Sequence, residues 1–158
     1  MKALIVYHTR TGHTRDAADD IARGLTDGGV ECVVKPAAEA AGEGAGSYDI
    51  VLFGTPTYGQ RMYHKPAKSV EGFLESLGPR GLEGKTAGAF AVNAGYGAEK
   101  LVKSIESQLE SMGARVVEGG PAVRAGAPLS LWKGPDAGAA DRSACEEYGK
   151  RVATAARG

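Results

Sequence analysis

Segments rich in apolar residues alternate along the chain with stretches in which apolar residues recur every three or four positions. The first kind has the length of a buried strand, and the second is typical of a helix with one apolar face. The strand-like segments lie at 2–7, 30–35, 49–53 and 86–92, with a fifth at 114–118 that resumes at 122–124. The run ALIVY at 3–7 has no polar break, which predicts a central strand covered on both faces.

Helical stripes follow these segments. They comprise Ala17, Ile21 and Leu25; Pro66, Val70, Phe73, Leu74 and Leu77; Leu101, Ile105, Leu109 and Met112; and Ala144, Tyr148 and Val152. The weakest helix falls at 37–41, where glycines cut it off. Strand and helix therefore alternate five times, which predicts parallel strands joined by right-handed crossovers. We expect an α/β fold, a three-layer doubly wound sheet in a single domain over residues 1–158.

Composition and charge narrow the function classes. The chain has 19 Lys+Arg and 19 Asp+Glu residues, and this balance argues against a general nucleic-acid or membrane-surface binder. The apolar run at 3–7 is too short for a membrane span or a signal-peptide core, so we expect a cytoplasmic protein. Cys32 and Cys145 lie far apart and form no metal motif with the three histidines, which predicts two isolated buried thiols and no metal site.

The loop after the first strand has the composition of a phosphate site. It reads HTRTGHT over 8–14 and runs directly into a helix. Backbone N–H groups at a helix N-terminus are unpaired and carry a partial positive charge, which suits a phosphate. Thr9, Thr11 and Thr14 add hydroxyl donors, and Gly12 lets the backbone approach a ligand closely. The alternative is that Thr11 or Thr14 only caps the helix, which accounts for one threonine and not for three.

Two neighbouring loops each carry one tyrosine bordered by glycine. The loop after the third strand reads GTPTYGQ over 54–60, and the loop after the fourth reads NAGYG over 93–97. Because open parallel sheets bind ligands at the carboxyl ends of their strands, Tyr58 and Tyr96 can sandwich a flat ring; the alternative is that both pack on surface apolar groups. Neither GxGxxG nor GxxxxGK[ST] occurs, so we expect one terminal phosphate. A phosphate together with a large planar heterocycle is FMN.

These three segments resemble the flavodoxin family, most closely its short-chain members and the flavodoxin domains of A-type, diiron-linked flavoproteins. The likeness rests on TRTGHT, TPTYG and NAGYG and runs from Lys2 to Val152. It implies a flavodoxin-like fold, a five-stranded parallel sheet of order 2-1-3-4-5, and FMN as the cofactor. It also implies a cofactor-binding set. The phosphate side comprises Thr9, Arg10, Thr11, Gly12, His13 and Thr14, and the ring side comprises Thr55, Pro56, Thr57, Tyr58, Gly59, Asn93, Ala94, Gly95, Tyr96 and Gly97.

The chain departs from the family pattern in three ways. His13 stands where the family usually has asparagine, and Tyr58 stands where many flavodoxins have tryptophan. Flavodoxins as a group are strongly acidic, whereas this chain is neutral, so docking onto a basic partner by charge is not implied. Arg61, His64 and Lys65 follow the second loop, either as solvated charges or as a cationic rim that meets the reduced cofactor, an NADPH phosphate or an acidic partner.

The resemblance implies an FMN-binding electron-transfer protein that shuttles electrons between redox partner proteins, with no catalytic residue assigned. The alternative is an FMN-dependent oxidoreductase that takes NAD(P)H directly and reduces a quinone or another small molecule. Such enzymes usually carry an extra segment, and no long insertion is evident between Gly59 and Thr86. A receiver-type signalling domain needs acidic residues where this chain has His8 and Gly54. Trp132 fits ordinary packing better than a cover over the flavin edge.

Overall fold

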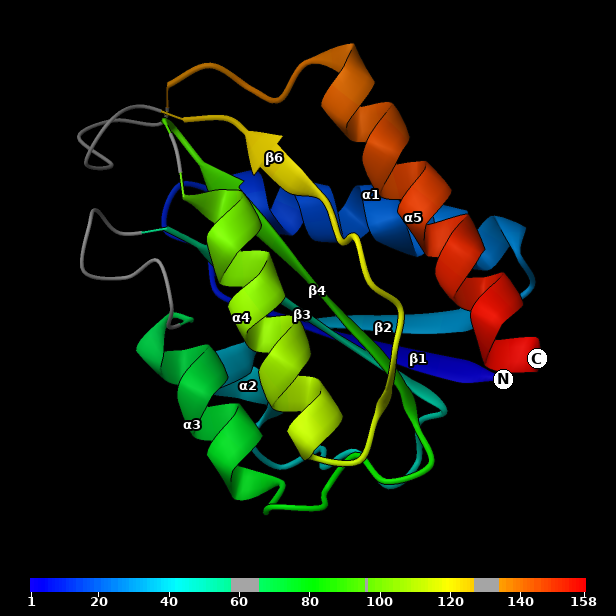
Figure 1. Ribbon diagram of the computed structural model, residues 1–158. Coiled ribbons are helices and arrows are strands. Elements are labelled where there is room, and N and C mark those ends of the chain that lie inside the picture. Colours follow the sequence, from blue (N-terminus) through cyan, green and yellow to red (C-terminus); the bar gives the residue numbers. More distant parts are fainter. Residues whose placement is uncertain (58–65, 96, 127–133) are drawn as a thin grey trace.

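The structure alternates strands and helices as the apolar pattern predicts. This computed structural model describes residues 1–57, 66–95, 97–126 and 134–158 (Figure 1). The strands are β1 (Lys2–Tyr7), β2 (Glu31–Pro36), β3 (Ile50–Pro56), β4 (Thr86–Asn93), β5 (Arg115–Val116) and β6 (Ala122–Arg124). The helices are α1 (His13–Asp27), α2 (Ala37–Ala40), α3 (Lys68–Ser76), α4 (Ala98–Ser111) and α5 (Ala139–Arg157).

The strand pairs of the sheet are parallel throughout its described part. The order is β2-β1-β3-β4, and both β5 and β6 pair with the far side of β4. In the register, Ala3 lies opposite Ile50 and Ile50 lies opposite Thr86, so the three central strands begin at one level. The α/β class and the order 2-1-3-4-5 are confirmed, with β5 and β6 together filling the fifth position. That residues 1–158 form one domain stays a prediction.

The fifth strand is split, and its first part is shorter than the sequence predicts. β5 covers only two residues of the expected 114–118. The break lies at a Gly-Gly-Pro sequence, where Gly119 has a φ of +76° and Pro121 has no N–H to donate to a neighbouring strand. A Cβ atom at Gly120 would lie 1.6 Å from the carbonyl oxygen of Ala89, so the chain passes too close to β4 for a larger residue.

Helices cover both faces of the sheet (Figure 1). α1 and α5 lie on one face, where Ile21 and Tyr148 are buried in a cluster with Ile5 of β1. α2, α3 and α4 lie on the other face, where Leu74 and Leu101 belong to the second buried cluster. Because both faces are covered, the central strands have almost no polar side chains, which is why they read as continuous apolar runs.

Two element boundaries near the loop after β3 differ from the predictions. β3 continues to Pro56, beyond its predicted end, because its last residues still pair with β4. The ladder extends one step further, since Thr57 N donates to Val92 O at 3.0 Å. α3 begins at Lys68, later than predicted, because the preceding Ala67 is still extended with ψ 148°. The connection between β3 and α3 therefore begins later and also ends later than predicted.

The carboxyl ends of the strands lie at one edge of the sheet, which we call the rim. The marked chain termini lie at the opposite edge (Figure 1). The rim gathers the loops that follow β1, β3 and β4, as the parallel order requires. None of the helices in the described part of the chain combines the length and the hydropathy that a membrane span needs.

Candidate functional site

Three loops at the rim carry the predicted cofactor-binding residues. The structure describes all of the first loop, 8–12, together with 54–57, 93–95 and Gly97 of the other two. The predicted stacking rings, Tyr58 and Tyr96, lie outside the described residues. So do Gly59, the cationic residues Arg61, His64 and Lys65, and Trp132. What these residues do stays a prediction, and the site is built below from the described ones.

The first loop ends in an α-helix that no side chain caps. Its N-cap residue is Gly12, which has a left-handed φ of 94° and no side chain to offer the first turn. Thr9 Oγ1 instead accepts a hydrogen bond from Gly12 N at 2.9 Å, which bends the loop ahead of the helix. Thr14 is buried within the first turn. Neither Thr11 nor Thr14 is the cap, so the capping alternative is wrong.

An uncapped N-terminus leaves backbone N–H groups available to an anion. The first turn of α1 carries the positive end of the helix dipole, and phosphate oxygens accept from such groups. Apart from the two chain neighbours of Gly12, no heavy atom of the described residues lies within 4 Å of the position that a Cβ atom on Gly12 would occupy, so the space beside this turn is open. The arrangement suits a phosphate.

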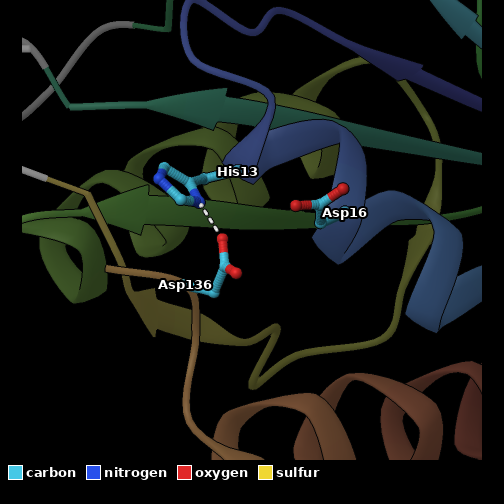
Figure 2. A group of neighbouring side chains, drawn as sticks. All are labelled: His13, Asp16 and Asp136. Atoms are coloured by element: carbon cyan, nitrogen blue, oxygen red, sulfur yellow. Dashed lines mark ion pairs between the residues drawn. The ribbon is translucent and has the colours of Figure 1, made fainter. Parts of the chain in front are cut away.

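His13 and two aspartates lie together beside the same turn (Figure 2). The His13 side chain is 4% exposed, and its Nδ1 lies 3.7 Å from Asp136 Oδ1, while the Asp136 side chain is 72% exposed. Asp16 points toward the same place, and one ligand atom from each of the three residues lies within 4.8 Å of the others. These are donor types that a divalent cation accepts, but both carboxylates are exposed, and such groups are common without an ion. The two carboxylates place negative charge beside the loop that is predicted to bind the phosphate.

His8 lies between the first loop and α3. Its Nδ1 and Ser69 Oγ hydrogen-bond at 2.9 Å, and its backbone N–H donates to Gly54 O at 3.0 Å. Burial, and then the nearby Arg10 guanidinium, lower the pKa of His8 below its usual value. The ring is therefore neutral at neutral pH and serves to join the first loop to α3.

The described part of the second loop is held by the hydroxyl of Thr55. This fully buried side chain accepts from Ala67 N at 2.9 Å and donates to Pro56 O at 3.1 Å. It thereby joins the start of the loop to the residue just before α3. The hydroxyl shapes the loop, and contact between Thr55 and a cofactor stays a prediction.

The third loop contains a buried polar atom with unused hydrogen-bonding capacity. Asn93 at the end of β4 is 9% exposed, and its Nδ2 donates to Val123 O at 3.4 Å. Its Oδ1 has no hydrogen-bond partner, and it is the one buried side-chain oxygen or nitrogen of which this holds among the described residues. A cleft of about 540 Å³ opens beside it, lined by Gly95, Gly97 and Arg124 among others. Gly97 is the left-handed N-cap of α4, and again no side chain caps the helix.

The two cysteines are not among the predicted cofactor-binding residues. Both are free; Cys145 is buried in α5 and Cys32 is half-buried in β2, so the prediction of two buried thiols holds fully only for Cys145. Burial raises the pKa of Cys145 to about 12, and the pKa of Cys32 is also raised by burial. Neither belongs to a cluster of metal-ligating side chains within the described ranges.

Residues 5–148 match the sequence model of the flavodoxin family. The chain belongs to the flavodoxin family. Flavodoxin family proteins bind FMN, so the predicted cofactor is confirmed, and the family and fold point to electron transfer. Two features of the rim of this flavodoxin fit the cofactor. The uncapped start of α1 faces open space beside Gly12, and the buried Oδ1 of Asn93 has no hydrogen-bond donor within the described fold.

Solved structures of similar fold include other flavodoxins. Flavodoxin 2 of Bacillus cereus has a TM-score of 0.78 at 23% sequence identity, over 98% of this chain and 99% of that one. A flavodoxin from the domain Archaea has a TM-score of 0.76 at 20% identity and covers 100% of each chain. Rubredoxin oxygen:oxidoreductase of Desulfovibrio gigas has a TM-score of 0.79 at 20% identity, over 99% of this chain but only 36% of that chain. At these identities the likeness shows the fold.

Two charged residues at the rim were missed in the sequence. Asp136 precedes α5, and Arg124 ends β6, far from the loop motifs along the chain. Arg124 could have been found, because the predicted strand at 122–124 has its carboxyl end at the same rim. Asp136 gives no such signal, since it lies in an irregular segment that only the tertiary structure brings beside His13.

Proposed function

We propose that this flavodoxin is a cytoplasmic electron carrier that binds FMN at the rim and passes electrons between redox partner proteins. The phosphate is held by residues 9–14, and the ring lies between 55–59 and 93–97, with Tyr58 and Tyr96 stacking on it. The observation that carries the proposal is the start of α1 at Gly12 without a side-chain cap. The other described helices also begin without a side-chain cap, so α1 is set apart by its place at the rim and by the open space beside Gly12.

The phosphate end is favoured by both charge and geometry. An anion at a helix N-terminus gains about 0.3–2 kcal/mol from the dipole alone, and hydrogen bonds to a charged acceptor are stronger than neutral ones. Thr9 fixes the loop through Gly12 N, and Thr11 stays half-exposed at the mouth of the site. The loop is thus shaped before a ligand arrives, which lowers the cost of binding.

The ring end is supported by Asn93. A buried acceptor without a partner costs about 1–3 kcal/mol, and a flavin ring carries an N–H group on its polar edge that can satisfy such an acceptor. Asn93 Oδ1 beside the cleft is placed to accept from it. FMN supplies the redox chemistry when bound, and the residues of the chain hold and orient it.

A carrier needs no proton-transferring side chain at the rim. His8 hydrogen-bonds to Ser69, and burial lowers its pKa, so it is not set up as a general acid. Direct use of NAD(P)H to reduce a quinone remains the competing activity.

The decisive experiment titrates the apoprotein with FMN and, as a control without phosphate, with riboflavin. We expect tighter binding of FMN than of riboflavin, because only FMN reaches the start of α1. The holoprotein is then mixed with NADPH, with and without a quinone, and separately reduced by dithionite and offered cytochrome c. A carrier reduces cytochrome c and leaves NADPH unused. Rapid quinone-dependent oxidation of NADPH would favour the reductase, and absence of FMN binding would overturn both.

A further inference from the structure

Arg124 joins the end of β6 to the loop that follows β4. Its Nη2 donates to the carbonyl oxygen of Gly95 at 3.0 Å, across a separation of 29 residues. Gly95 belongs to the loop proposed to line the flavin ring, and Arg124 lines the same cleft of about 540 Å³. The guanidinium is therefore a cation fixed at the ring end of the site.

The backbone of Arg124 is held independently of its side chain. In the register of β4 and β6 it lies opposite Asn93, and Ala125 N donates to Asn93 O at 3.0 Å. On its other side, Asp141 Oδ2 in the first turn of α5 accepts from Arg124 N at 3.1 Å. Changing the side chain therefore leaves the strand in place and removes only the guanidinium.

The cleft carries an excess of positive charge. Among the described residues, its ionisable lining consists of Arg124, Lys100 and Glu99, two cations and one anion. The chain as a whole is neutral, so this local cation is not part of a general basic surface. All three side chains are exposed, so salt will screen the effect in part.

We propose that Arg124 is a positioning residue that fixes the Gly95 carbonyl and favours the reduced state of FMN by its charge. The proposal rests on the proposed function. When the oxidised ring takes up two electrons and one proton from solvent, it gains one negative charge. A cation fixed at the ring end attracts the reduced ring more than the oxidised ring, which raises the two-electron potential of the bound cofactor.

Two substitutions separate the two roles. Arg124→Gln removes the charge, and Arg124→Lys keeps the charge while removing the planar fork that holds the Gly95 carbonyl. For Arg124→Gln we expect the affinity for reduced FMN to fall about two- to tenfold more than that for oxidised FMN. A tenfold difference corresponds to a potential lower by about 30 mV for a two-electron couple. Arg124→Lys should keep the potential near that of the wild type but weaken the binding of both redox forms.

Arg157→Gln is the matched control. Arg157 is another exposed arginine whose Nη2 donates to a loop carbonyl, that of Gly28, at the carboxyl end of α1, away from the rim. This variant should leave both FMN affinity and potential unchanged. Thermal unfolding of all three apoproteins checks that they fold.

The readouts are the dissociation constant of oxidised FMN, from quenching of its fluorescence, and the potential from redox titration at two salt concentrations. We expect the difference between wild type and Arg124→Gln to shrink at high salt. An unchanged potential in Arg124→Gln overturns the role of the charge, and unchanged FMN affinity in Arg124→Lys overturns the positioning role. If the wild type binds no FMN, the proposed function fails, and this proposal fails with it.

Discussion

Gly24 of α1 and Gly149 of α5 face each other where the two helices cross. A Cβ atom at Gly149 would lie 2.2 Å from the carbonyl oxygen of Ile21, and one at Gly24 would lie 2.0 Å from that of Glu146. Both clashes are with backbone, which cannot rotate away as a side chain can. The helices that cover one face of the sheet are thus in backbone contact, and any larger residue forces them apart.

Gly149→Ala should therefore destabilise the protein. Overpacking costs about 1–3 kcal/mol, which exceeds the gain of up to about 1 kcal/mol from the better helix propensity of alanine. Gly72→Ala is the matched control, because Gly72 is also within a helix but, beyond its own helix, no heavy atom of the described residues lies within 4 Å of its Cβ position. It should stabilise by about 0.5–1 kcal/mol. Urea unfolding of both variants measures the two free energies, and equal effects would contradict the steric account.

Glu106 should make stability depend on pH. It is buried on α4, and its Oε1 accepts from Gly120 N at 3.2 Å, at the break between β5 and β6. Burial raises the pKa of its carboxyl, and this is the largest effect. The hydrogen bond from Gly120 N lowers the pKa, and the negative charge of Glu118 raises it further. A raised folded-state pKa means that the folded protein binds the proton more tightly than the unfolded chain. The contribution of Glu106 to the free energy of unfolding is fully present below the ordinary glutamate pKa of about 4.5. It is lost as the pH rises through the folded-state pKa of Glu106.

Glu106→Gln removes this titration while keeping an oxygen for Gly120. We expect the free energy of unfolding of the variant to fall less than that of the wild type between about pH 4.5 and neutrality. Urea unfolding across this range measures the slope. Glu75→Gln, an exposed glutamate on α3, is the control and should keep the slope of the wild type. A slope equal to the wild type in Glu106→Gln would rule out the effect of burial.

Much of this fold was predictable, because the apolar pattern records which faces of each element are covered. Burial on both sides makes β1 apolar from Ala3 to Tyr7, and the glycines after α1 and α4 end those helices. The interruption of the fifth strand was predictable from the sequence, but the shortness of its first part was not. Its cause is the close approach of Gly120 to Ala89, a contact between backbones that no hydrophobic pattern records.

The candidate site was predictable where its residues follow one another along the chain. The first loop is such a case, since Gly12 ends it and starts α1, and both roles follow from local sequence. Arg124 and Asp136 enter the rim from separate segments, through β6 and the stretch before α5. Their placement depends on how helices and strands pack together, so sequence motifs alone do not identify them.

Removing the charge of Asp136 should strengthen the binding of FMN. Its carboxylate lies 3.7 Å from His13 Nδ1, beside the turn proposed to hold the phosphate, and it repels an anion there. Because the group is exposed and screened by salt, the gain for Asp136→Asn should be about two- to fivefold and smaller at high salt. Riboflavin, which lacks the phosphate, should bind the variant and the wild type alike.

Asp27→Asn is the control for Asp136. This exposed aspartate ends α1 at the far side from the rim, so its removal should leave the FMN titration unchanged. Weaker FMN binding in Asp136→Asn would mean that the carboxylate serves to orient His13, and the repulsion argument would fail.

Replacing Asn93 should weaken FMN binding without lowering the stability of the apoprotein. Its Oδ1 is buried without a partner, and among the described residues its side chain donates one hydrogen bond, from Nδ2 to Val123 O, which is long at 3.4 Å. Asn93→Leu removes an unsatisfied acceptor that costs about 1–3 kcal/mol, so the apoprotein should be no less stable than the wild type. The same change removes the acceptor proposed for the flavin N–H, so FMN affinity should fall about tenfold or more. Urea unfolding of the apoprotein and FMN titration measure the two effects, and loss of stability with unchanged affinity would show that Asn93 serves the fold alone.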